Sequence, residues 1–163
     1  MAKSYLNQSG LPLGLRNNNP GNLVKTSIAW DGKIPVSQNS GVFEQFYELR
    51  YGLRALMKQL VTDMSRGLTT ISLIINKYSP PHENNTAAYI QTVSNVMGIG
   101  PNQAITALNK AFLLKMVKAI VSVEIGSNYA HYVTSQDYED AFAIAGLNLS
   151  GVNLPAPKKK ITT

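Results

Sequence analysis

Apolar residues near the N-terminus alternate with polar ones, which is the period of a β-strand. The alternation runs from Ile28 to Val36 and is interrupted by Asp31-Gly32. An Asp-Gly pair between alternating segments is typical of a two-residue hairpin turn, because both turn residues need a positive φ. Residues 42–46 provide a candidate third strand. The pattern therefore predicts a small antiparallel sheet in this region.

From Tyr51 onward the apolar residues recur every three or four positions, which is the period of an amphipathic helix. Cap and stop residues divide this region into about five helices. Their expected bounds are Tyr51 to Gly67, Thr69 or Thr70 to Pro80, Asn84 or Asn85 to Gly98, 103 to 125 after Asn102, and Ser135 to Gly146. The longest expected helix therefore lies after Gly98. A small sheet with these helices predicts a mostly helical α+β fold.

The chain has 163 residues, of which 44% are hydrophobic and 15% charged, so it is neither disordered nor too short for a core. We expect one domain over residues 1–149. Residues 150–163 combine prolines with Lys158, Lys159 and Lys160, and they predict a flexible basic tail. We therefore expect that removing residues 150–163 leaves folding intact.

Composition excludes several kinds of chemistry. The chain has no cysteine and only two histidines, so thiolate chemistry and a histidine metal cage are excluded, and we expect neither a metal nor an organic cofactor. The formal net charge of +6 favours an anionic partner such as a bacterial wall or membrane. Basic and aromatic residues form no binding stripe, so no nucleic acid is expected. Residues 1–10 lack the apolar run of a signal peptide.

Glu124 is the carboxylate whose position suggests chemistry. On a helix it projects within about 40° of Leu113, Val117 and Ile120, so it continues an apolar stripe at the last turn. Burial and the negative end of a helix both raise the pKa of a carboxyl group, as a general acid requires. The alternative is a glutamate that points outward at a frayed helix end.

Two other glutamates have weaker claims. Glu83 lies between Pro80-Pro81 and Asn84-Asn85, where it is either a catalytic residue or a charge at a helix N-terminus. Glu44 lies between Phe43 and Phe46 and faces either a cleft or water. They are the alternatives to Glu124.

An asparagine-rich segment follows the N-terminal lead-in, and it includes Asn17, Asn18, Asn19 and Asn22. Amide side chains both donate and accept hydrogen bonds, and Pro20-Gly21 can fix them in a turn. This chemistry suits the hydroxyl and N-acetyl groups of sugars. The alternative is a turn whose side chains bond its own backbone.

An ordered series of short motifs resembles a family of phage virion-associated proteins that degrade peptidoglycan. The motifs are GLRNNNPGNL (14–23), WDG (30–32), Phe43 with Phe46, YGLRA (51–55), PPHEN (80–84), Thr86 with Tyr89-Ile90, and AIVSVEIG (119–126). The family is similar to lysozymes and lytic transglycosylases. In related enzymes the glutamate helix precedes the other motifs, so this chain resembles a circularly permuted version. The resemblance implies a lysozyme-like domain with Glu124 as the catalytic acid.

The resemblance implies a phage glycosidase that cleaves the MurNAc–GlcNAc β-1,4 bond of peptidoglycan. The residues that would line the glycan cleft are Asn17, Asn18, Asn19, Asn22, Trp30 and Tyr89. A single glutamate suffices for a lytic transglycosylase, whereas a hydrolase usually needs a second carboxylate. We expect the transglycosylase mechanism, with a hydrolase or a non-catalytic, wall-binding virion protein as alternatives. The protein would act in the virion, the host periplasm or the cell wall, in contact with glycan strands and with other virion proteins or a membrane.

Overall fold

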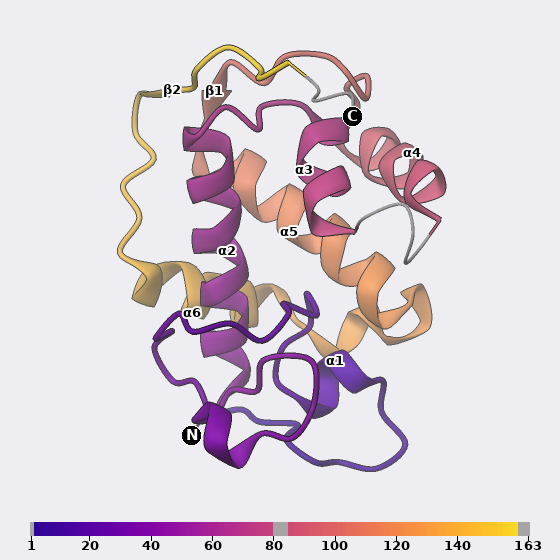
Figure 1. Ribbon diagram of the computed structural model, residues 1–163, viewed down its shortest axis with the longest axis vertical. Coiled ribbons are helices and arrows are strands. Elements are labelled where there is room, and N and C mark those ends of the chain that lie inside the picture. The colour runs from indigo at the N-terminus through magenta and orange to yellow at the C-terminus, as the bar shows by residue number, and fades with distance from the viewer. Residues whose placement is uncertain (1, 80–84, 160–163) are drawn as a thin grey trace. The chain divides into compact units, whose positions relative to one another are not determined.

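The structure is a computed structural model that describes residues 2–79 and 85–159, and its mostly helical α+β architecture confirms the expected fold class (Figure 1). It divides into two compact units. Unit 1 comprises Met1–Lys58 and Ile120–Leu147, and unit 2 comprises Gln59–Ala119 and Asn148–Thr163. Helices α2 (Leu49–Ser65) and α5 (Lys110–Ile125) each contribute residues to both units.

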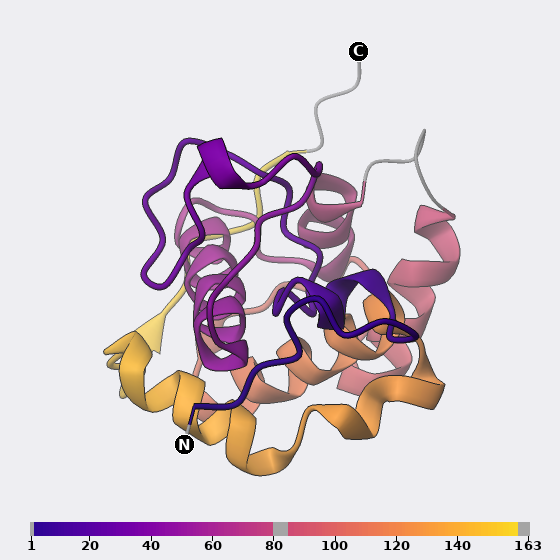
Figure 2. The same cartoon turned by 90° about the horizontal axis from the view of Figure 1, so that it is seen from below.

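Unit 1 joins short helices to a set of irregular loops. It contains α1 (Leu13–Arg16), the 3-10 helices Val36–Gln38 and Ser127–Tyr132, and α6 (Ser135–Ala145). Figure 2 shows the N-terminal segment running beside α6. Lys3 binds Asp137 there at 2.7 Å, and the Tyr5 hydroxyl donates to the carbonyl oxygen of Tyr132 at 2.6 Å. These contacts attach the start of the chain to α6.

The sheet expected around Asp31-Gly32 is absent from unit 1, so that prediction was wrong. The turn forms, with Gly32 at a φ of 70°, but the segments beside it make only the isolated bridges Val24–Phe43 and Lys33–Phe46. Ile28 and Val36 remain 44% and 46% exposed. The alternation therefore does not mark a buried sheet face, which is what stabilises a strand pair in water.

Unit 2 contains α3 (Ile71–Tyr78), α4 (Thr86–Met97) and a two-strand antiparallel sheet of β1 (Ala107–Leu108) and β2 (Val152–Asn153). Helix α3 packs against α4, and their buried residues include Ile71, Ile75 and Val93. The small sheet of the predicted fold class therefore exists, but its strands come from segments that the sequence analysis assigned to a helix and a tail.

Helix boundaries agree with the cap signals in most places. The Thr70 and Asn85 side chains accept hydrogen bonds from the Leu73 and Ala88 amides, which confirms two expected N-caps. Helix α5 begins at Lys110 rather than 103, with Asn109 accepting from the Phe112 amide at 2.8 Å. Helix α2, with 17 residues, is therefore longer than α5, with 16. Thr134 rather than Ser135 caps α6, through a capping box with Asp137.

The described part of the expected flexible tail, residues 150–159, is hydrogen-bonded within unit 2. Strand β2 pairs with β1 in the register Ala107–Asn153 and Leu108–Val152. Beyond it, the Thr69 hydroxyl donates to the carbonyl oxygen of Pro155 at 3.0 Å, and the Lys158 amide donates to that of Gly67 at 2.9 Å. Residues 150–159 thus pack as part of unit 2.

Truncation after Leu149 should destabilise the protein, contrary to the expectation from sequence. It removes β2 and the hydrogen bonds at Pro155 and Lys158, each worth about 1 kcal/mol, so we expect the thermal midpoint to fall by about 5 °C or more. Calorimetry would measure the change against a chain truncated after Lys159, which keeps all of these bonds. Equal midpoints for the two truncations would show that the tail contributes nothing to stability.

Candidate active site

Glu124 lies in the last turn of α5, within the part of that helix that belongs to unit 1. Leu113, Val117 and Ile120 are all fully buried, which confirms the apolar stripe inferred from spacing. Glu124 itself is half-buried. A carboxyl group in this setting is partly desolvated yet still reaches the surface, as a group that meets a substrate must.

Asn22 holds the Glu124 carboxylate from the turn that follows α1. Its Nδ2 donates to Glu124 Oε1 at 2.9 Å, across 102 positions of sequence. The backbone of Asn22 has a φ of 51°, in the left-handed region that asparagine tolerates better than most residues. Its Oδ1 is buried and has no hydrogen-bond partner among the described residues. Asn22 is therefore the direct neighbour of the candidate acid.

Close packing fixes the turn against the end of α5. A Cβ atom at Gly14 would lie 3.0 Å from both Asn22 Oδ1 and Ile125 Cγ2. The Asn19 amide donates to the Gly14 carbonyl oxygen at 2.8 Å, and the Asn22 amide donates to the Asn19 carbonyl oxygen at 2.9 Å. The absence of a side chain at Gly14 therefore allows α1, the asparagine turn and the end of α5 to meet.

Three of the four candidate sugar-binding asparagines are buried and bonded within unit 1. Asn18 and Asn19 are fully buried. Asn18 accepts from the Tyr5 amide and donates to Ser4 Oγ and the Phe46 carbonyl oxygen, and Asn19 accepts from the Leu23 amide and donates to the Leu23 and Glu44 carbonyl oxygens. Asn17 is 7% exposed and accepts from Gln45 Nε2 at 3.0 Å. The alternative of a turn bonded to its own backbone describes Asn19, which bonds Leu23, whereas Asn18 bonds the backbone of Tyr5 and Phe46.

Glu44 is buried and faces neither a cleft nor water. Its side chain has no exposed surface, and its Oε2 lies 3.0 Å from the Lys33 Nζ, a side chain that is 8% exposed. Thr26 donates to the same oxygen through its amide and its hydroxyl, at 3.2 and 3.3 Å. This pair ties together the loops between α1 and α2, which favours a structural role for Glu44 over a catalytic one.

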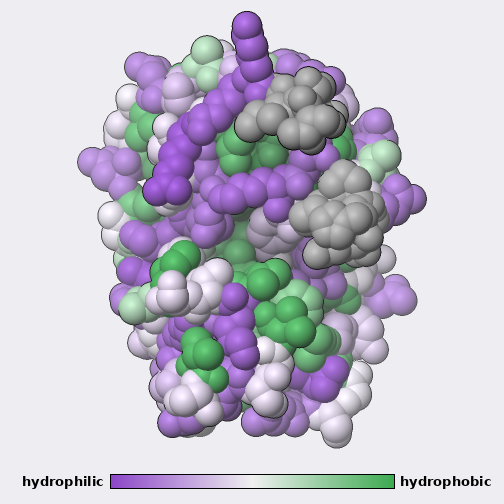
Figure 3. Space-filling view, in the orientation of Figure 1, coloured by the Kyte–Doolittle hydropathy of each residue, from purple (hydrophilic) through white to green (hydrophobic). Residues whose placement is uncertain are grey.

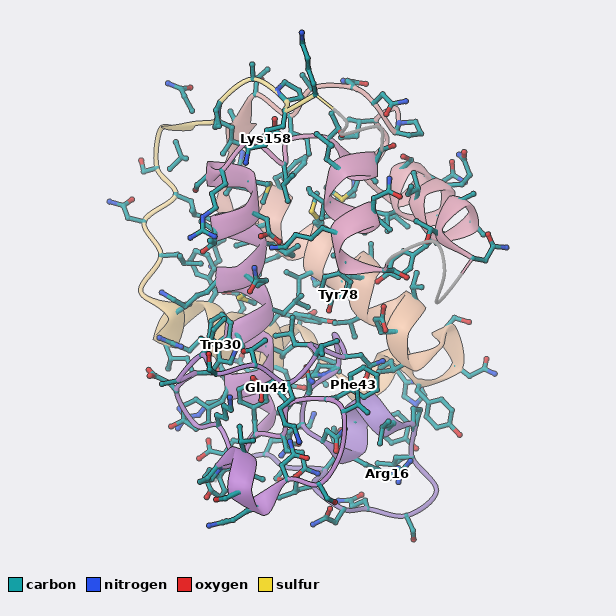
Figure 4. The ribbon with its side chains drawn as sticks, in the orientation of Figure 1. Arg16, Trp30, Phe43, Glu44, Tyr78 and Lys158 are labelled. Carbon is teal, nitrogen blue, oxygen red and sulfur yellow. The ribbon has the colours of Figure 1, made fainter. Side chains whose placement is uncertain are left out.

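The loops between α1 and α2 that carry this ion pair also expose apolar side chains. Val24 and Val42 are 56% and 68% exposed, and Figure 3 shows hydrophobic side chains on the surface of these loops. Phe43 and Glu44, labelled in Figure 4, are consecutive residues of one loop, yet Glu44 is the fully buried one. Glu44 therefore contributes to the interior of unit 1, where an aliphatic residue is more usual.

The remaining candidates lie in other parts of the chain. Glu83 lies outside the described residues. Trp30 is half-buried on the loop before Asp31, whose carboxylate pairs with Arg54 at 3.1 Å. Tyr89 belongs to α4 in unit 2 and is 6% exposed. Within unit 1, the hydrogen bond from Asn22 to Glu124 joins two of the predicted site residues through their side chains.

Residues 2–79 and 85–159 hold no group of three or more His, Cys, Asp and Glu side chains placed to bind a metal ion. Over the same residues, each helix is too short or too polar to cross a bilayer.

The structure defines the class as a mostly helical α+β protein in which an asparagine amide holds a glutamate at a helix end. No protein-family model matches the chain. Protein P5 of Pseudoalteromonas phage PM2 is 34% identical over 134 residues, which cover 79% of this chain and 81% of that relative. The chain therefore belongs to the Protein P5 family. Since the relative is a phage protein, it supports the expected association with a bacteriophage.

Sequence reasoning missed two features of this region. The sequence predicts the same sugar-binding role for Asn22 as for Asn17–Asn19. Asn22 is nevertheless separated from that run by Pro20-Gly21. The Lys33–Glu44 pair had no signal in either residue alone. Pairing the segment after the Asp31-Gly32 turn with the candidate third strand over residues 42–46 would have placed both residues in one region.

Glu44→Gln should destabilise the protein without a specific effect on activity. The change leaves the Lys33 ammonium buried beside a neutral amide, and removing one partner of a buried ion pair costs about 3–5 kcal/mol. Denaturant unfolding measures the loss, and activity per folded molecule should match the wild type. A stable but inactive variant would instead make Glu44 a catalytic residue.

Proposed function

We propose that the protein is a phage glycosidase that cleaves the MurNAc–GlcNAc β-1,4 bond of peptidoglycan, with Glu124 as general acid and base. The observation that carries the proposal is the half-buried Glu124 carboxylate at the end of α5, held by Asn22 at 2.9 Å. The phage relative supports the phage association, and the resemblance to peptidoglycan-degrading virion proteins supports the glycosidase assignment. The partner is the glycan strand, met at the virion, the host periplasm or the cell wall.

The proposed chemistry needs one carboxyl group. Glu124 first protonates the glycosidic oxygen as the bond to the anomeric carbon breaks. The resulting carboxylate then removes the proton from the C6 hydroxyl of the muramic residue, whose oxygen closes a 1,6-anhydro ring. A hydrogen bond from Asn22 to Oε1 assigns the transferable proton to Oε2 and fixes the plane of the carboxyl group.

The surroundings of the other acidic groups support a single-acid mechanism. Asp31, Glu44, Glu48, Asp63 and Asp137 each form an ion pair within the described residues. Each of these carboxylates is thus engaged by a basic side chain of the protein itself. Glu83 stays the alternative that would make the enzyme a hydrolase with a second carboxylate.

Glu124→Gln should abolish lysis of purified cell walls and leave the thermal midpoint nearly unchanged. The amide keeps the shape of the side chain but has no acidic proton, and general acid catalysis contributes about 10²–10⁴-fold. Turbidity loss of wall suspensions measures the rate. Glu139→Gln is the matched control, because Glu139 is an exposed glutamate on α6.

Lysis by Glu124→Gln within a few fold of the wild type would contradict the assignment. If the wild-type protein itself releases no wall fragments but binds walls, it is a wall-binding virion protein rather than an enzyme.

The products should carry 1,6-anhydromuramic ends. Ring closure by the C6 hydroxyl excludes water from the product, so each end is lighter by one water molecule than a hydrolysed one. Mass spectrometry of digested sacculi distinguishes the two. A digest that contains only reducing ends would show a lysozyme mechanism, and Glu83→Gln and Glu44→Gln would then be compared to find the second carboxylate.

A further inference from the structure

Unit 2 contains a cavity of about 680 Å³ that the proposed glycosidase chemistry does not use. The first turns of α3 and α4 form two of its walls, and Asn102, Pro157 and Lys158 complete it. A cavity of this size falls in the range that holds a small ligand, about 300–1,000 Å³. The described tail residues thus do more than stabilise the fold, because they close one side of this cavity.

The cavity combines amide groups with an apolar surface. Asn76 donates through Nδ2 to the Ser72 carbonyl oxygen, and Asn85 accepts through Oδ1 from the Ala88 amide. Their hydrogen bonds thus orient an acceptor (Asn76 Oδ1) and a donor (Asn85 Nδ2) for a ligand. Leu73 and Ile90, both half-buried, supply apolar surface. A ligand that fits must offer amide-like hydrogen bonds and small apolar groups together.

The charge of the lining favours an anion. Lys158 is its ionisable member, and no acidic side chain lines it among the described residues. The Lys158 amide bonds the Gly67 carbonyl oxygen at 2.9 Å, and a Cβ atom at Gly67 would lie 2.8 Å from Lys158 Cγ. The absence of a side chain at Gly67 therefore lets the stem of Lys158, labelled in Figure 4, lie against the chain there. The backbone of Lys158 is thus fixed at the edge of the cavity, with the stem of its side chain beside Gly67.

We propose that this cavity binds a short acidic peptide through its carboxylate and amide groups, and that the peptide is the one attached to peptidoglycan glycan strands. Peptide bonds match the amides of Asn76 and Asn85, alanine methyl groups match Leu73 and Ile90, and a carboxylate pairs with Lys158. An uncharged sugar would make no use of Lys158, and phosphate would make none of the apolar walls. The wall as the source of the peptide rests on the proposed function.

Calorimetric titration of the full chain with the tripeptide L-Ala-γ-D-Glu-diaminopimelate tests the proposal. We expect saturable binding that weakens with salt and that falls about tenfold in Lys158→Gln, because a charge-assisted hydrogen bond is lost. Lys159→Gln is the matched control: Lys159 is an exposed lysine next in sequence that does not line the cavity, and its variant should bind like the wild type.

The outcomes separate this site from the glycosidase site. Glu124→Gln should bind the tripeptide like the wild type even if it lyses no walls. Binding that is equal in the Lys158 and Lys159 variants, stronger for chitotetraose than for the tripeptide, or fully competed by inorganic phosphate at equal concentration would overturn the proposal. Equal affinity for L-Ala-L-Glu-L-Ala would overturn the wall as the source. A wild-type protein that lyses walls but does not bind the tripeptide would overturn this inference and leave the proposed function standing.

Discussion

Hydrogen bonds from buried asparagine amides determine the structure of unit 1. Its loops between α1 and α2 lack a β ladder, yet their buried backbone groups need partners. Asn18 and Asn19 supply these bonds to the Tyr5 and Leu23 amides and to the Phe46 and Glu44 carbonyl oxygens. The same turn then places Asn22 beside the end of α5. The conformation of the loops and the position of the candidate acid therefore depend on one short segment.

The candidate active site follows from this turn through close packing rather than through a cluster of charges. Gly14 lets the turn approach Ile125, and the left-handed backbone of Asn22 directs its amide at Glu124 Oε1. Glu44, another acidic residue of unit 1, forms an ion pair with Lys33. In our account the glutamate performs the chemistry and Asn22 positions it.

Local signals in the sequence predicted most of the helices but little of the sheet. A helix is stabilised by its own period and caps, so Thr70, Asn85 and Gly98 marked boundaries that the structure confirms. Strand β1 consists of two residues that pair with Val152–Asn153, and a pairing over that distance has no local signal. The expected start of α5 was wrong for this reason, and the same pairing places Val152–Asn153 of the expected tail in the sheet. Similarly, the asparagine run indicated hydrogen bonding, but only burial decides between a sugar and the backbone as the partner.

The pH dependence of wall cleavage by Asn22→Asp tests most directly whether Asn22 positions Glu124 as the general acid. Cleavage requires protonated Glu124, so kcat/KM falls as the pH rises through its pKa. An aspartate at this position places a like charge where the amide now lies, 2.9 Å from Glu124 Oε1. This raises the pKa of Glu124, and the falling limb should move upward by about one pH unit. Asn22→Gly, which relieves the positive φ and adds no charge, provides the comparison for backbone effects. A falling limb at the same pH in the wild type and Asn22→Asp would contradict the account.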